Sequence, residues 1–134
     1  MAQEPTGRTY IGTLTFPFRE FSYVFRVGSP ERGVTSVRDS IVFATLMKTQ
    51  QVSLDERGGQ FKGWLDDPYD SNETGPMTRN ISERPEYDSR FPNHPLSRAR
   101  WVLGHLQRTV AIDNSVKQQP KFCFDRNLPS RHRT

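Results

Sequence analysis

Residues 87–108 read YDSRFPNHPLSRARWVLGHLQR and contain the most informative pattern in the chain. Five apolar side chains recur there and just beyond at spacings of 3, 4, 3 and 4 residues: Leu96, Ala99, Leu103, Leu106 and Val110. This spacing places them in one stripe on an α-helix of roughly four turns. Pro95 suits the first turn of a helix, and Asn93 or His94 precedes it as a candidate cap. The pattern predicts a helix over 95–111 with one buried face.

The pattern in residues 10–27 predicts an antiparallel β-hairpin. Tyr10, Leu14 and Phe16 fall on one face of an extended chain. The run EFSYVFRV alternates its side chains with period two, as half-buried strands do, and the short segment PFRE before it suits a turn. A second hairpin is expected in QVSLDERGGQFKGWL, where Gly58 and Gly59 can supply a positive φ at the turn.

Residues 34–47 carry helical spacing instead. One apolar stripe is expected to face the core: Val34, Val37, Ile41 and Ala44. Ser36 and Asp39 are three residues apart and form a capping arrangement. A short apolar run also fits a strand, so a strand over 41–47 stays open. Together these elements predict an α+β fold with an antiparallel sheet of two hairpins and two helices.

The 134 residues of the chain are the length of one domain, which we expect to span 1–116. Prolines and glycines interrupt 66–94 too often for a long element, so this segment is expected to be an irregular loop. A loop of that length is unusual, and we expect its aromatic side chains to pin it to the fold. Residues 117–134 are polar and basic and are expected to form a peripheral tail, in which only 122–124 docks as a short edge strand.

The net charge of +4 is unevenly distributed along the chain. Residues 117–134 hold five cations against one acid, so the body of the chain is neutral. Within the body, 66–88 has a local charge of −5 and 89–116 one of +3. An acidic loop therefore precedes a basic helix, and the two are expected to neutralise each other on one surface.

The sequence offers no recognisable metal site. His94 and His105 are eleven residues apart on the predicted helix, which separates them by about 16 Å, so one ion cannot bind both. Cys123 has no second cysteine near it. Residues 70–81 begin like a calcium-binding loop, but Ile81 stands where calcium chemistry requires a bidentate carboxylate. No metal or cofactor is expected.

Catalytic signatures are also missing from the sequence. It contains no nucleophile elbow, no phosphate-binding glycine-rich loop and no dinucleotide fingerprint. An enzymatic function is therefore less favoured than a binding function, and no catalytic residue is assigned. No window is apolar and long enough for a membrane span, and the start lacks the pattern of a signal peptide. The cytoplasm is the expected location, which the single Cys123 fits.

The helix 95–111 carries a second stripe, formed by Arg98, Trp101, His105 and Arg108. Tryptophan and arginine dominate the energetics of protein interfaces, so this face predicts a protein-interaction domain of the accessory, adaptor or immunity type. A possible second patch consists of Asp66, Asp67 and Asp70. The partner is expected to be another protein, with no membrane involved. Two alternatives stay open: Trp101 is buried in the body, or the basic helix and tail bind nucleic acid, which the neutral body disfavours.

Overall fold

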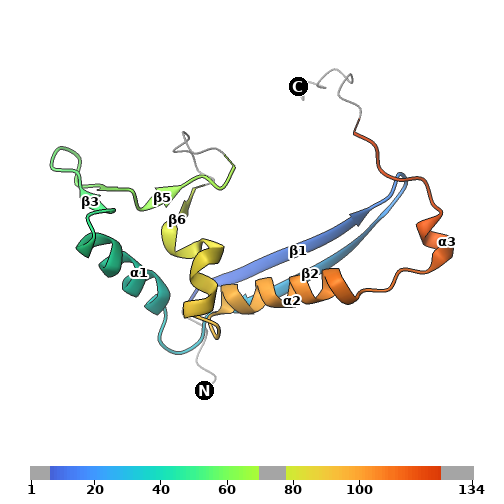
Figure 1. Cartoon of the computed structure of the whole chain (residues 1–134), viewed down its shortest axis with the longest axis horizontal. Coiled ribbons are helices and arrows are strands. Elements are labelled where there is room, and N and C mark those ends of the chain that lie inside the picture. Colours follow the sequence, from blue (N-terminus) through green and yellow to red (C-terminus); the bar gives the residue numbers. More distant parts are fainter. Residues whose placement is uncertain (1–6, 70–77, 125–134) are drawn as a thin grey trace.

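The computed structural model describes residues 7–69 and 78–124 and has an α+β fold. Figure 1 shows a long hairpin with a helix along it, and a second helix with short strands beside it. The strands are β1 (Thr9–Pro17), β2 (Ser22–Pro30), β3 (Ser53–Leu54), β4 (Phe61–Lys62), β5 (Leu65–Asp66) and β6 (Arg79–Asn80). The helices are α1 (Val37–Lys48), α2 (Pro95–Thr109) and α3 (Asn114–Lys117), with two 3₁₀ helices, η1 (Ile81–Glu83) and η2 (Pro85–Arg90).

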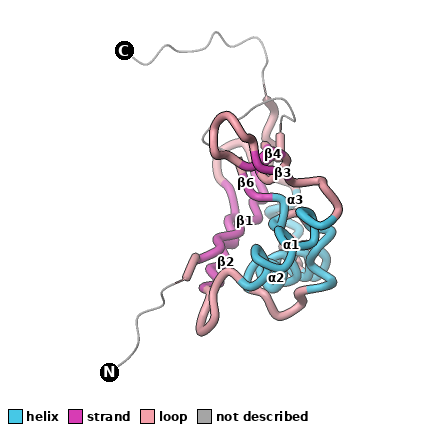
Figure 2. The backbone as a smooth tube through the Cα atoms, turned by 90° about the vertical axis from the view of Figure 1, so that its left-hand side faces the viewer, coloured by secondary structure: helices cyan, strands magenta, loops and turns pink. Residues whose placement is uncertain are grey.

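The predicted first hairpin is confirmed. Strands β1 and β2 pair antiparallel from Thr9 opposite Pro30 to Pro17 opposite Ser22. The backbone N–H of Phe18 closes the turn on the carbonyl of Phe21 at 2.8 Å. Alternate β1 side chains are partly buried, as the period-two pattern requires. Figure 2 shows the two strands on one side of the molecule and the helices α1 and α2 on the other.

Helix α2 lies against both strands of the hairpin. It begins at Pro95 and ends at Thr109, within two residues of the expected range. The stripe predicted to be buried is buried or half-buried along its whole length, with Ala99 in the core. The Leu103 side chain occupies the space that a Cβ on Gly12 would need. Gly12 therefore allows the helix to approach the strand closely.

Helix α1 is confirmed as a helix, but its predicted buried face is wrong. The buried side chains are Arg38, Val42 and Leu46, one residue out of step with the expected stripe. The predicted stripe is exposed instead, with Val34 the most exposed of its members. The Ser36 side chain makes no capping hydrogen bond, because this residue is in the left-handed conformation, with φ of 62°. Burial of Arg38 sets the rotation of α1, and hydropathy alone could not predict it.

The apolar core lies between α1 and the segments that follow it. Four buried residues form its centre: Val42, Leu46, Val52 and Ile81. Four larger side chains pack around them: Phe43, Trp64, Tyr87 and Phe91. The predicted second hairpin is present as the two-residue strands β3 and β4, and Gly59 has the expected positive φ of 64° in its turn.

The segment 66–94 is more ordered than predicted. Strand β5 pairs with β6, so that Leu65 lies opposite Asn80 and Asp66 opposite Arg79. The 3₁₀ helices η1 and η2 follow, and Pro85 begins η2, where its missing N–H costs nothing. Tyr87 and Phe91 pin the segment to the core, as expected, but Tyr69, which was expected to do the same, is exposed. Residues 70–77 lie outside the described residues.

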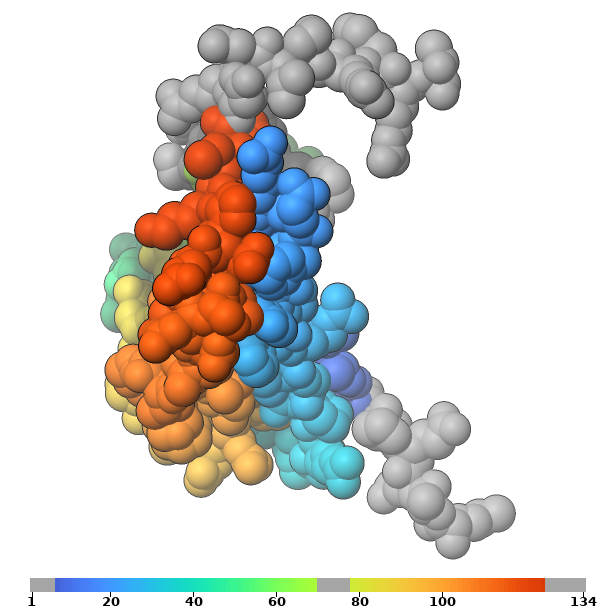
Figure 3. Space-filling model, turned by 90° about the vertical axis from the view of Figure 1, so that its right-hand side faces the viewer, coloured from blue at the N-terminus to red at the C-terminus, as the bar shows by residue number. Residues whose placement is uncertain are grey.

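The chain after α2 returns to the hairpin. Figure 3 shows α3 and its flanking residues in red against the blue strands. Asp113 caps α3 by accepting the backbone N–H of Ser115 at 2.8 Å. Lys121 forms a β-bridge with Phe18, just before the segment 122–124 that was expected to dock. The domain boundary at residue 116 stays a prediction, and among the described residues no helix has the length and apolarity needed to cross a membrane.

The contact between Leu103 and Gly12 gives a prediction with an internal control. Gly12→Ala should lower the free energy of unfolding by roughly 1–2 kcal/mol, because the new methyl group overpacks Leu103. Gly28→Ala on the neighbouring strand should be neutral or stabilising, because no atom lies within 4 Å of its Cβ position. The measurement is urea denaturation followed by circular dichroism. In a Leu103→Ala background, Gly12→Ala should lower the free energy of unfolding by less. An unchanged loss would contradict the contact between Leu103 and Gly12.

Candidate functional site

A buried arginine organises the base of the site. Arg38 is 1% exposed, yet each nitrogen of its guanidinium group donates a hydrogen bond. The acceptors are the carbonyl oxygens of Ser82 (2.7 Å) and Arg84 (3.1 Å), Ser97 Oγ (2.8 Å) and Asp88 Oδ1 (3.0 Å). These groups belong to or flank η1, η2 and α2. A buried charge is stable only when it is paired and hydrogen-bonded, so Arg38 holds these segments in one arrangement against α1.

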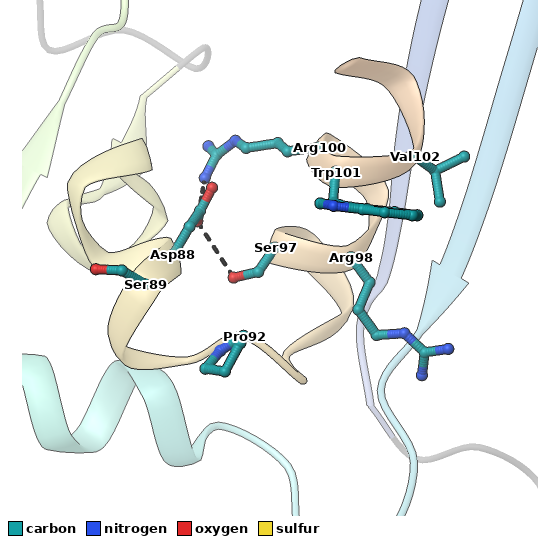
Figure 4. Close-up of a pocket in the computed structure, with 8 residues that line it drawn as sticks. All are labelled: Asp88, Ser89, Pro92, Ser97, Arg98, Arg100, Trp101 and Val102. Carbon is teal, nitrogen blue, oxygen red and sulfur yellow. Dashed lines mark hydrogen bonds and ion pairs between the residues drawn. The ribbon is translucent and has the colours of Figure 1, made fainter. Parts of the chain in front are cut away.

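Asp88 is the acid of this network and links it to the surface of α2. Its Oδ1 atom accepts hydrogen bonds from Arg38, from Arg100 Nη1 at 2.8 Å and from Ser97 Oγ at 3.3 Å. Arg100 also donates to the carbonyl oxygen of Glu83. Figure 4 shows Asp88 between Arg100 and Ser97, with both interactions drawn. One carboxylate thus faces two guanidinium groups and fixes the first turns of α2 against η2.

His94 caps α2 from the other side. Its Nδ1 atom accepts the backbone N–H of Leu96 at 3.2 Å, so the neutral ring carries its proton on Nε2 and donates it to Glu31 Oε1 at 3.4 Å. Burial lowers the pKa of His94, and the charge of Arg38 lowers it further. The ring also makes an edge contact with Tyr10, with 5.2 Å between ring centroids. Of the two predicted candidates, His94 is the cap.

Other ionisable groups lie near the His94 cap. Burial and the nearby charges of Glu31 and Asp39 raise the pKa of Tyr10, so its hydroxyl stays protonated. Burial also raises the pKa of Glu83. Glu31 is itself buried and accepts the backbone N–H groups of Arg8 and Ser36. These bonds connect the strand ends to the starts of α1 and α2, which is a structural role.

The four predicted interface residues lie on the outer side of α2. Arg98, His105 and Arg108 are exposed, and the Trp101 side chain is 65% exposed. The ring of Trp101 stacks on His105 with 5.4 Å between centroids and an angle of 8° between planes. The alternative that Trp101 is buried in the body is wrong. The role of this face as an interface stays a prediction.

A pocket of about 650 Å³ opens beside Trp101. Figure 4 shows the residues that line it: Asp88, Ser89, Pro92, Ser97, Arg98, Arg100, Trp101 and Val102. Asp88, Ser97 and Arg100 belong to the hydrogen-bonded network, whereas Arg98 points away from it. The sequence did not mark Asp88 or Ser97 as part of this site, because Asp88 meets Ser97 and Arg100 of α2 only in the folded chain.

The second predicted patch is partly neutralised. Asp66 makes ion pairs with Arg79 at 3.3 Å and Arg84 at 3.1 Å. Asp67 accepts the backbone N–H of Tyr69 at 2.7 Å, and Asp70 lies outside the described residues. No group of three metal-ligating side chains occurs in the parts of the chain that the structure describes. The exposed face of α2 is therefore the stronger candidate site.

Comparisons with protein-family models, with curated proteins and with solved structures gave no match in any of the three cases. The function of the chain is inferred from the geometry of this site alone.

The Arg38 network gives a prediction about stability. Arg38→Leu should lower the free energy of unfolding by roughly 3–5 kcal/mol, because it leaves Asp88 and two carbonyl groups without their buried donor. Arg38→Lys should also destabilise, because a single ammonium group cannot reproduce the planar fork. The matched control is Arg57→Leu, an exposed arginine, which should cost about 0.5 kcal/mol or less. Equal costs for Arg38→Leu and Arg57→Leu in denaturant melts would contradict the role of Arg38.

His94 gives a prediction about pH. Its pKa in the folded protein is lower than the usual value of about 6.5, so below about pH 6.5 the unfolded chain binds a proton that the folded chain does not. The contribution of His94 to stability is complete above that pH and decreases as the pH falls. His94→Asn keeps a capping side chain and removes the titration, so stability should change less between about pH 7.5 and pH 5.5.

The exposed and non-ionisable Gln107 supplies the control for this experiment. Gln107→Asn should leave the pH dependence of the melting temperature as it is in the unmodified chain. A His94→Asn variant with an unchanged pH dependence would show that His94 is not the titrating group.

Proposed function

We propose that this chain is a non-enzymatic protein-interaction domain of the accessory, adaptor or immunity type. Its contact face is the outer side of α2, with Arg98, Trp101, His105 and Arg108. The observation that carries the proposal is the exposure of Trp101 on a helix whose start is held by a cap and a buried ion-pair network. Exposed tryptophan and arginine side chains on a rigid element are typical anchors of protein interfaces. The expected compartment is the cytoplasm.

Preorganisation supports this choice of face. The ring of Trp101 rests on His105, so it loses less conformational freedom on binding than a free side chain would. The side chain of Arg98 has no hydrogen bond or ion pair within the described residues, which leaves its five donors for a partner. Both features favour a face that binds a partner over a face that contacts only solvent.

Nucleic-acid binding is the weaker candidate. Several cations near α2 are already paired inside the protein: Arg38 and Arg100 with Asp88, and Arg84 with Asp66. Of these, Arg100 belongs to the basic helix, so the formal charge of that helix overstates the positive charge that it presents to a polyanion. A nucleic-acid complex would also weaken steeply with salt, whereas an interface anchored by tryptophan would weaken little.

The test is capture from an extract of the native host by the tagged chain, at low and moderate salt and after nuclease treatment. Arg98→Glu combined with Arg108→Glu should abolish recovery of a specific protein, because it reverses the charges beside Trp101. The fold should persist, because exposed charges contribute little to stability, and circular dichroism checks this.

The matched control is Arg26→Glu combined with Arg57→Glu, which makes the same charge change at two exposed arginines away from α2. This variant should recover the partner normally. A photo-crosslinking residue at position 101 should also label the partner, whereas the same residue at position 57 should not. Equal recovery by the folded Arg98/Arg108 variant would exclude this face.

A further inference from the structure

Two pockets meet on the first half of α2. The first is the pocket beside Trp101, and the second, of about 470 Å³, lies between α2 and the end of β2. Arg98 and Val102 line both pockets. They are four residues apart and so are neighbours on one side of the helix. The two pockets therefore adjoin each other across Arg98 and Val102, and we call the surface that they form together, from η2 to β2, the α2 groove.

The α2 groove presents unpaired positive charge. Arg32 lines the second pocket and is exposed, and its side chain, like that of Arg98, has no hydrogen bond or ion pair within the described residues. Among the described residues, Asp88 is the only carboxylate that lines either of these pockets, and it is already held by two arginines. A ligand in the groove therefore meets two free guanidinium groups and no free acid. This charge is complementary to carboxylates, which guanidinium groups bind with two parallel hydrogen bonds.

Apolar side chains line both pockets and predominate in the first. Trp101, Val102 and Pro92 line the first pocket, and Val27, Pro30 and Pro95 line the second. Such surfaces accept bulky apolar side chains. The groove therefore suits a chain in which acidic and apolar side chains are combined.

We propose that the α2 groove binds an extended acidic peptide segment of the partner protein. Carboxylates of this segment pair with Arg32 and Arg98, and a bulky apolar side chain packs against Trp101. The inference rests on the proposed function and adds to it the chemistry of the partner. A nucleic-acid strand fits less well, because Trp101 is the only aromatic ring among the described residues that line the groove, and His105 covers one of its faces.

The test is selection from a displayed library of random peptides against the immobilised full chain. Selected peptides should contain Asp or Glu together with a bulky apolar residue. One selected peptide, fluorescently labelled, then serves as the probe for affinity. Arg32→Glu and Arg98→Glu should each weaken its binding by roughly tenfold, as the loss of one charge-assisted contact does. Replacing its acids with Gln or Asn should weaken binding to the unmodified chain by a similar factor.

Charge reversal provides the sharpest comparison. A chain with Arg32→Glu and Arg98→Glu should select peptides rich in Lys and Arg from the same library. The control with Arg26→Glu and Arg57→Glu should select the same acidic peptides as the unmodified chain. Circular dichroism confirms that each variant is folded. An oligothymidine strand should not compete with the acidic peptide.

Three results would overturn the inference. They are selection of no peptides or of neutral ones, affinity that does not change in the Arg32 and Arg98 variants, and displacement of the peptide by oligothymidine. The proposed function is judged separately. If position 101 crosslinks to a host protein but no acidic peptide is selected, only the inference about the partner fails. If acidic peptides bind but position 101 crosslinks to nothing, the proposed function fails.

Discussion

The burial of the Arg38 guanidinium group is the constraint on which the rest of the structure depends. Taking such a charge out of water is costly unless every nitrogen finds an acceptor. The acceptors come from segments 44 to 59 residues further along the chain. One side chain therefore fixes the rotation of α1, the positions of η1 and η2, and the start of α2. The polar network does this because the apolar core is small, with five buried apolar residues among those described.

The same network determines what α2 can offer to a partner. Asp88 and Arg100 hold the inner side of the helix against η2, while His94 caps its first turn. The outer side is left with Trp101 and Arg98, which have no such internal role. A helix fixed at its start and free on its outer face presents these side chains in one geometry, which limits the entropy lost on binding. The residues that stabilise the fold and those of the proposed contact face thus lie on neighbouring parts of one helix.

Part of the charge near α2 is balanced internally. The sequence places an acidic segment before a basic one, and the structure pairs Asp88 of the first with Arg100 of the second. Asp66 is paired within its own segment, with Arg79 and Arg84. Some cations near α2 have no ion pair among the described residues. Two of them, Arg32 and Arg98, lie in the same pocket although the sequence separates them widely.

The sequence alone determined the elements whose signals are local. Period-two alternation fixed the first hairpin, and the spacing of five apolar residues fixed both α2 and the exposed face that carries Trp101. His94 and Pro95 marked the start of α2 for the same reason, because capping acts within a few residues.

Only the tertiary structure decided the rotation of α1, the pairing of β5 with β6 and the composition of the α2 groove. Each depends on partners far apart in the chain, and periodicity carries no information about such partners. Arg38 shows this most clearly. Hydropathy places an arginine on the surface of α1, and the acceptors that make its burial favourable exist only once η1, η2 and α2 have come together.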